Sequence, residues 1–196
     1  MILRVSDAGG SRPADGIARA IAKGDFLAML LLSAGQPCPN HLPLPHMHFC
    51  HVDQVIECGP DRAVTLKGVS LAEEYLQDHF PGFPVLPGVF MLEALVQTAR
   101  LTLMARDRAA GREPVRMVLG GVRALRYGNF VRPGDSLRSE AVLDKVESDG
   151  TVVFRGSASV VRAGSAEALP GAAASGRFTM RTVRLGQQRT TGGLQL

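Results

Sequence analysis

Residues 79–97 read His79-Phe-Pro-Gly-Phe-Pro-Val-Leu-Pro-Gly-Val-Phe-Met-Leu-Glu93-Ala-Leu-Val-Gln97, and this stretch decides the fold. Its first half contains three prolines and two glycines, which fix or free backbone angles and predict a loop held in one shape. From residue 89 the sequence changes to Leu, Ala, Met and other apolar residues, which favour a helix over residues 89–104. Because apolar side chains occupy nearly every side of this helix, we expect it to be buried.

Two ionisable side chains, His79 and Glu93, stand at the ends of this loop. A carboxylate in an apolar setting is costly unless it is paired or hydrogen-bonded, and Gln97, four residues on along the same helix face, is a candidate partner. An imidazole and a carboxylate so placed suggest an acid/base pair. The residue types alone leave two other interpretations open. Glu93 is also typical of a solvent-exposed helix start, and His79 of a structural hydrogen-bonding residue before a turn.

The stretch closely resembles the active-site segment of the β-hydroxyacyl-(acyl carrier protein) dehydratases of fatty acid synthesis, which reads His-Phe-Pro-Gly-x-Pro-Val-x-Pro-Gly-Val and then Glu-Ala-x-x-Gln. Downstream, Gly121-Val-Arg-Ala-Leu-Arg-Tyr127 and Val131-Arg-Pro-Gly-Asp-Ser-Leu137 resemble a strand and the V-x-P-G-D turn of that family. Upstream, His51-Val-Asp-Gln-Val55 resembles its first strand. The resemblance covers residues 42–162, and Glu93 places the chain with the Glu-type relatives rather than with the Asp-type relatives that also isomerise their product.

The resemblance implies an α+β hot-dog fold, in which a curved antiparallel sheet wraps one long buried central helix. It also implies an enzyme that dehydrates (3R)-3-hydroxyacyl thioesters to trans-2-enoyl thioesters without a cofactor. His79 would take the C2 proton, Glu93 would protonate or hydrogen-bond the leaving hydroxyl, and the Gly88 amide would polarise the thioester carbonyl. Family sites combine the His of one subunit with the Glu of its partner, so we expect a homodimer or a trimer of dimers.

Substrate contacts are expected from apolar residues of the loop and helix, from an aromatic residue at the tunnel mouth and from the helix glutamine: Phe83, Val85, Leu86, Phe90, Tyr127 and Gln97. A strand-end packing role for Tyr127 stays open. The chain carries a net charge of +4 and a pI of about 9.3, which would attract an acidic acyl carrier protein. The candidate docking residues are Arg123, Arg126, Arg132 and Arg138. Ordinary solvated strand faces are the competing interpretation, and Gly128-Asn129 stands where the family has a Lys/Arg pair.

Two rival functions are considered. A thioesterase of the same fold would hydrolyse the acyl thioester, but that class does not resemble the His-Phe-Pro-Gly segment. A non-catalytic acyl-binding subunit would keep the tunnel without turnover, and the presence of His79, Gly88 and Glu93 argues against it. Product analysis separates the three possibilities as enoyl thioester, free thiol or neither.

The chain is expected to hold one hot-dog domain at residues 42–185, after an N-terminal extension at 1–41 and before a flexible tail at 186–196. A helical pattern covers residues 13–32 of the extension. Period-two alternation and turn residues predict strands within the domain. These strands are placed at residues 51–58, 63–69, 115–127, 136–146, 151–161 and 176–183, with a longer loop at 163–176.

Composition agrees with one soluble domain. Apolar residues make up 45% of 196 residues, which is enough for one sizeable core, and no run reaches the eighteen apolar residues of a membrane span. Three cysteines without paired spacing suit a reducing compartment, so we expect a cytoplasmic protein. Nucleic acid binding is disfavoured by the absence of a binding motif. A metal site is considered because of the crowded residues His41, His46, His48, Cys50 and His51, but local hydrogen bonding of these histidines is preferred.

Overall fold

The computed structural model describes residues 49–165 and 167–183. Most of the predicted domain at residues 42–185 lies within these ranges. The extension at 1–41 with its predicted helix, the tail at 186–196, and His41, His46 and His48 all lie outside the described residues.

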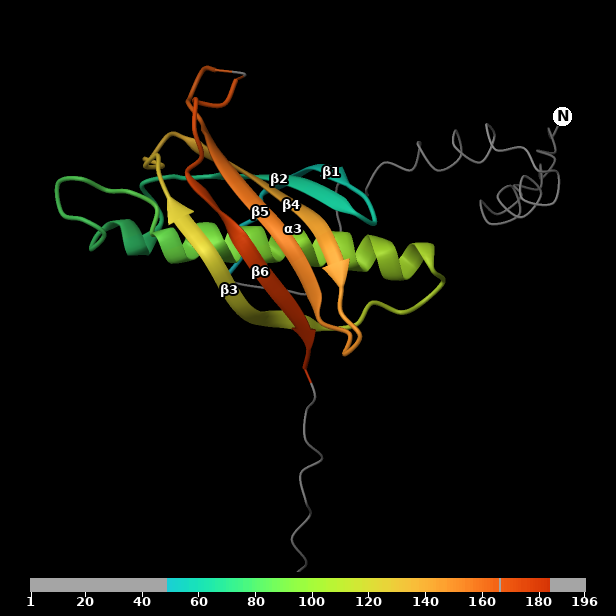
Figure 1. Cartoon of the computed structure of the whole chain (residues 1–196). Helices are drawn as coiled ribbons and strands as arrows, with labels where there is room; N and C mark the ends of the chain where they lie inside the picture. Colours follow the sequence, from blue (N-terminus) through green and yellow to red (C-terminus); the bar gives the residue numbers. More distant parts are fainter. Residues whose placement is uncertain (1–48, 166, 184–196) are drawn as a thin grey trace, which may run out of the picture. The chain divides into compact units, whose positions relative to one another are not determined.

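Six strands form one antiparallel sheet (Figure 1). They are β1 (Gln54–Cys58), β2 (Arg62–Gly68), β3 (Met117–Tyr127), β4 (Ser136–Val146), β5 (Val152–Val161) and β6 (Ala174–Thr182). Their order across the sheet is β1-β2-β4-β5-β6-β3, so β1 and β3 are the two edges. Strand β5, predicted at residues 151–161 from period-two alternation, shows that alternation, because Val152, Phe154, Ala158 and Val160 are buried whereas Arg155 is exposed.

One long helix, α3 (Gly88–Ala109), packs across the sheet (Figure 1). Its buried residues include Leu95, Val96 and Leu101, which lie in the core beneath the strands. On the sheet side, the rings of Phe154 and Phe178 stack with centroids 5.7 Å apart. The arrangement of one central helix and a six-stranded antiparallel sheet confirms the predicted hot-dog fold.

The observed element bounds differ from the predicted ones mainly at two places. The helix extends to Ala109, five residues beyond the predicted end, where Asp107 accepts hydrogen bonds from the Arg112 side chain and the Val115 amide. The first strand begins at Gln54 rather than at residue 51. Asp53, just before this strand, makes a side-chain hydrogen bond, in which its carboxylate accepts from the Gly68 amide.

Helix α3 is long and apolar enough to pass as a membrane span, although no such span was predicted. More than half of its most apolar 18-residue stretch, 56%, is buried inside the fold. Because the sheet covers this helix, we interpret it as a core helix. A short 3-10 helix, η1 (Glu74–Leu76), precedes the loop that carries His79.

Candidate active site

The loop before α3 is held in one shape by backbone hydrogen bonds. The Val85 amide donates to the carbonyl of His79 at 3.0 Å, and the Leu86 amide donates to the carbonyl of Val131 at 2.9 Å. The side chain of His79 closes the same turn, because its Nδ1 lies 2.9 Å from the carbonyl oxygen of Val85. A carbonyl only accepts, so Nδ1 carries a proton in this bond, and in the neutral imidazole Nε2 then keeps its lone pair. The half-buried imidazole is therefore oriented with a basic nitrogen available.

Gly88 is the first residue of α3, with Pro87 as its N-cap. The Gly88 amide therefore has no acceptor inside the helix and lies at the positive end of the helix dipole. The ring of Tyr127 covers this glycine so closely that a Cβ added at Gly88 would lie 2.8 Å from it. A backbone donor with these properties is suited to stabilising an anionic oxygen.

The predicted pairing of Glu93 with Gln97 is confirmed. Gln97 Nε2 donates to Glu93 Oε1 at 3.0 Å, and Arg100 Nη1 lies 3.6 Å from the same oxygen. The Glu93 side chain retains 28% of its exposed surface. The carboxylate is therefore held between an amide and a guanidinium and still reaches the surface, which differs from the apolar surround expected from the sequence.

Gln97 itself is buried, with 1% of its surface exposed. Besides Glu93, its Nε2 donates to the carbonyl of Phe49 at 3.1 Å, and its Oε1 accepts from the amide of His51 at 2.8 Å. Both N–H groups of the amide are thus used by the protein. In this geometry the side chain ties the Glu93 carboxylate to residues 49–51, and the predicted contact of Gln97 with substrate stays a prediction.

His79 and Glu93 belong to separate networks within one chain. His79 bonds to the loop and stacks on Phe80, with ring centroids 4.2 Å apart, whereas Glu93 bonds along α3. Among residues 49–165 and 167–183, no hydrogen bond or ion pair joins the two side chains. Neither side chain is therefore occupied by the other, and each can face a substrate or another subunit.

The predicted substrate-contacting residues fall into two groups. Val85 and Leu86 are buried, with 1% and 2% of their surfaces exposed, whereas Phe83 and Tyr127 are 42% and 52% exposed. Phe90 is partly buried and packs against an aromatic cluster formed by Phe49, His51 and Tyr75. Burial raises the pKa of the Tyr127 hydroxyl.

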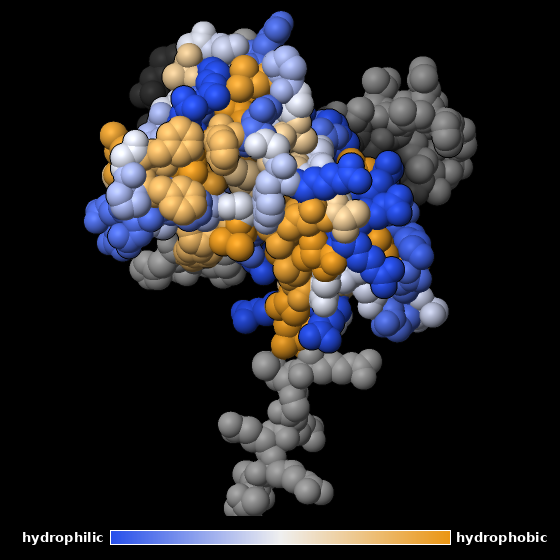
Figure 2. Space-filling model, turned by 60° about the vertical axis from the view of Figure 1, so that its left-hand side comes forward, coloured by the Kyte–Doolittle hydropathy of each residue, from blue (hydrophilic) through white to orange (hydrophobic). Residues whose placement is uncertain are grey.

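Exposed apolar residues surround the His79 loop: Phe80, Phe83, Val89, Tyr127 and Phe130. Figure 2, in which this end of the molecule comes forward, shows hydrophobic side chains gathered on the surface. Phe83 is held there by an edge-on contact with Phe130 and by the Arg132 guanidinium, 5.1 Å from its ring centre.

The four arginines predicted to form one docking cluster do not lie together. Arg123 and Arg126 are on edge strand β3, whereas Arg138 is on β4, and β5 and β6 separate the two strands. Arg138 is paired with Glu140 on its own strand at 3.2 Å. Arg132 instead contacts Phe83. The four arginines are close in sequence but lie apart in the structure, because the strand order of the sheet is not sequential. Their role in carrier-protein docking stays a prediction.

The histidine-rich segment is described only from Phe49 onward, so the metal hypothesis is untested for His41, His46 and His48. Within the described part of the chain, no three His, Cys, Asp or Glu side chains group as metal ligands. His51 is 3% exposed and neither ring nitrogen has a described hydrogen-bond partner. Its ring stacks on Phe90, and burial, aided by Lys67, lowers its pKa. The expected local hydrogen bonding of this imidazole is therefore wrong, because an aromatic packing site takes its place.

Comparison with known proteins places this geometry in context. Residues 44–166 match the family model of the FabA-like domain. The chain is 41% identical over 108 residues to the 3-hydroxyacyl-(acyl-carrier-protein) dehydratase FabZ of Oenococcus oeni, covering 54% of this chain and 76% of the relative. It is also 41% identical over 105 residues to the FabZ of Chloroflexus aggregans, covering 53% and 71%.

Among solved structures, the dehydratase heterocomplex ApeI:P from Xenorhabdus doucetiae has a similar fold. The superposition has a TM-score of 0.59 at 18% identity and covers 76% of this chain and 94% of the other. At this identity, the likeness supports the fold alone.

Proposed function

Because the chain belongs to the FabA-like family, we propose that it dehydrates (3R)-3-hydroxyacyl thioesters, carried by acyl carrier protein, to trans-2-enoyl thioesters in fatty acid or related lipid or polyketide synthesis. The observation that carries the proposal is the orientation of His79, whose Nδ1 is bonded to the Val85 carbonyl and whose Nε2 is left basic. The similarity to two FabZ dehydratases supports the same reaction.

The reaction begins with removal of the C2 proton by Nε2 of His79. The Val85 carbonyl fixes the tautomer and stabilises the imidazolium that forms. Negative charge moves to the thioester oxygen, where the Gly88 amide donates a hydrogen bond and the helix dipole adds to it. The glycine also leaves room for Tyr127, whose ring covers the start of the helix.

Loss of the hydroxyl completes the reaction. The C3–O bond breaks, the C2–C3 double bond forms, and Glu93, which enters this step as the protonated carboxylic acid, delivers its proton to the departing oxygen so that water leaves and a carboxylate remains. Gln97 and Arg100 contact Oε1 of the Glu93 carboxyl group, which leaves Oε2 to carry the proton that is transferred. The proton held by His79 then passes to the Glu93 carboxylate, directly or by exchange through solvent, and both groups return to their starting forms. No cofactor is needed for these steps.

The functional unit that we propose is a homodimer, or a trimer of dimers, in which His79 of one subunit faces Glu93 of another. Three observations support it. The two side chains are not bonded within one chain, apolar residues around the His79 loop are exposed, and the outer side of edge strand β3 has no neighbouring strand among the described residues. An unpaired edge beside exposed apolar side chains favours association.

Within this dimer, Phe83, Val85, Leu86 and Phe90 would line the acyl tunnel, with Tyr127 near its mouth. Mixing inactive His79→Ala and Glu93→Ala proteins after partial unfolding and refolding tests the shared site. Random pairing should restore about a quarter of the wild-type activity, because half of the dimers would contain one complete site. Recovery near zero, with dimers present by light scattering, would argue against a site shared between subunits.

Product identity tests the reaction. Purified protein is given a (3R)-3-hydroxyacyl thioester on carrier protein and on a small thiol, and enoyl formation is followed alongside release of free thiol. Enoyl product is expected with both. Free thiol instead would indicate a thioesterase, and no turnover across several chain lengths would indicate a non-catalytic acyl-binding subunit. We propose the cytoplasm as its compartment, in keeping with the unpaired spacing of the cysteines.

A further inference from the structure

Positive charge is unevenly divided over the sheet. The three neighbouring strands β5, β6 and β3 contain no acidic residue. They contain five arginines, which we call the arginine face: Arg123, Arg126, Arg155, Arg177 and Arg181. On the other half of the sheet the charges are mixed, and Glu140 accepts hydrogen bonds from both Arg62 and Arg138.

The strand register brings three of these arginines into one row. Arg123 on β3 lies directly opposite Arg177 on β6, which lies directly opposite Arg155 on β5. Residues opposite one another in an antiparallel sheet point to the same side. The adjacent row pairs Val122 with Phe178 and Phe178 with Phe154, and it belongs to the core.

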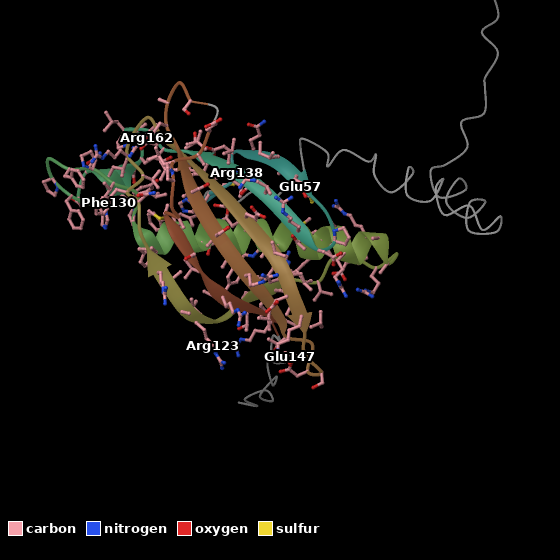
Figure 3. The ribbon with its side chains drawn as sticks, turned by 45° about the horizontal axis from the view of Figure 1, so that its top comes forward. Glu57, Arg123, Phe130, Arg138, Glu147 and Arg162 are labelled. Carbon is pink, nitrogen blue, oxygen red and sulfur yellow. The ribbon has the colours of Figure 1, made fainter. Side chains whose placement is uncertain are left out.

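The arginine row therefore points to solvent, away from α3. All three arginines are exposed, and Figure 3 shows Arg123 projecting from the outer side of the sheet at a distance from Arg138. Arg126 lies opposite Ser175, two residues before Arg177 on β6, and therefore points to the same side of the sheet.

Like charges directly opposite one another destabilise a sheet. Arg155 has an acidic neighbour, Asp144, at 3.4 Å. For Arg123, Arg126 and Arg177 no ion pair is formed within residues 49–165 and 167–183. The electrostatic repulsion among these arginines is thus not compensated within the described residues, and an acidic partner bound to this side of the sheet would reduce it. Guanidinium groups suit carboxylates in particular, because they bind them with two parallel hydrogen bonds.

We propose that the arginine face is the docking surface for the acidic acyl carrier protein that delivers the substrate. This inference rests on the proposed dehydratase function. It differs from the cluster predicted from the sequence by keeping Arg123 and Arg126 and adding Arg155, Arg177 and Arg181. Arg132 and Arg138 are left out because neither lies on β3, β5 or β6. Gly128 and Asn129 hold the position of the family's Lys/Arg pair, so that pair cannot supply a basic docking surface in this chain.

The test compares Arg177→Glu with Arg108→Glu. Both arginines are exposed and neither has a described acidic partner, so each change alters the net charge equally, but Arg108 lies near the end of α3. The kcat/KM is measured with the same acyl chain on carrier protein and on pantetheine, at low and high salt. Circular dichroism confirms that both variants fold.

Arg177→Glu is expected to lower kcat/KM for the carrier-bound substrate about tenfold at low salt, with pantetheine turnover unchanged, and added salt should shrink the difference. Arg108→Glu should stay within about twofold of wild type for both substrates. An equal loss in the two variants, or no loss in either, would overturn the proposal.

Two further measurements separate this proposal from its premise. If wild-type protein fails to turn over pantetheine substrate, the dehydratase function has failed, and binding of labelled carrier protein by fluorescence anisotropy still tests the docking surface. Binding that Arg177→Glu weakens supports docking at the arginine face. If carrier binding is unaffected by Arg177→Glu while binding to phosphatidylglycerol vesicles is lost, the face serves an anionic membrane and the proposal is overturned.

Discussion

Replacement of Gln97 by alanine tests whether this residue positions Glu93 or contacts substrate. The side chain is 1% exposed and joins three partners, the Glu93 carboxylate, the Phe49 carbonyl and the His51 amide. Because none of these partners belongs to a substrate, Gln97→Ala is expected to lower kcat by about tenfold or more while the KM for a small-thiol substrate stays nearly constant.

The expected loss of stability follows from the same contacts. The buried His51 amide loses its acceptor, which costs about 1–3 kcal/mol. Removing the side chain atoms leaves a cavity that costs about 1–2 kcal/mol more. The Phe49 carbonyl adds little, because Phe49 is 51% exposed and water can replace the lost bond. The sum of about 2–5 kcal/mol corresponds to a fall in Tm of about 4–20 °C for a chain of this length.

Scanning calorimetry measures the change in Tm, and Gln97→Met serves as the matched control. Methionine fills a similar volume without the hydrogen bonds, so it should retain only the hydrogen-bond part of the loss, about 1–3 kcal/mol. A loss below about 1 kcal/mol in the alanine variant would refute the assigned network. A raised KM with unchanged kcat would instead support the substrate contact originally predicted for Gln97.

Three other predictions concern single positions. Gly88→Ala should abolish most activity, because its Cβ would lie 2.8 Å from the Tyr127 ring. The double variant Gly88→Ala/Tyr127→Ala should lose less free energy of unfolding than the two single variants lose in sum, because the clash is then removed. Gly156→Ala should lower the free energy of unfolding in urea by about 1–3 kcal/mol, since a Cβ there would lie 2.8 Å from a phenylalanine ring in the core; a neutral change would contradict that packing. Glu140→Gln should destabilise the fold at neutral pH, because the hydrogen bond from Arg62 lowers the pKa of Glu140 below 4.5. The stability that this carboxylate contributes is present above pH 4.5 and is lost as the pH falls through the lowered pKa. The free energies of unfolding of variant and wild type, measured against pH, should therefore converge in acid, and a difference that stays constant would contradict the prediction.

The sequence predicted those features that depend on local pattern. The helix over residues 89–104 follows from its apolar, helix-favouring residue types, and five of the six strands follow, within two residues at each end, from period-two alternation and turn residues. The Glu93–Gln97 pair follows from a spacing of four residues. The features that the sequence did not predict depend on contacts between residues that are far apart in the chain. The other partners of Gln97 are 46 and 48 residues away in sequence, and no local pattern indicates them.

The arginine face shows the same limit. Alternation along β5 placed Arg155 on the outer side of its strand, but its nearness to Arg177 and Arg123 follows only from the order β5-β6-β3. Arginines close in sequence, such as Arg126 and Arg138, were separated by that order.

The most direct test of the central claim is the initial rate of enoyl formation from a small-thiol (3R)-3-hydroxyacyl substrate in His79→Ala and Glu93→Ala, compared with wild type. Because His79 removes the proton and Glu93 delivers one, each variant should lose at least about a hundredfold in kcat while keeping the wild-type fold by circular dichroism. A folded variant of either residue that retains activity within about tenfold of wild type would contradict the account.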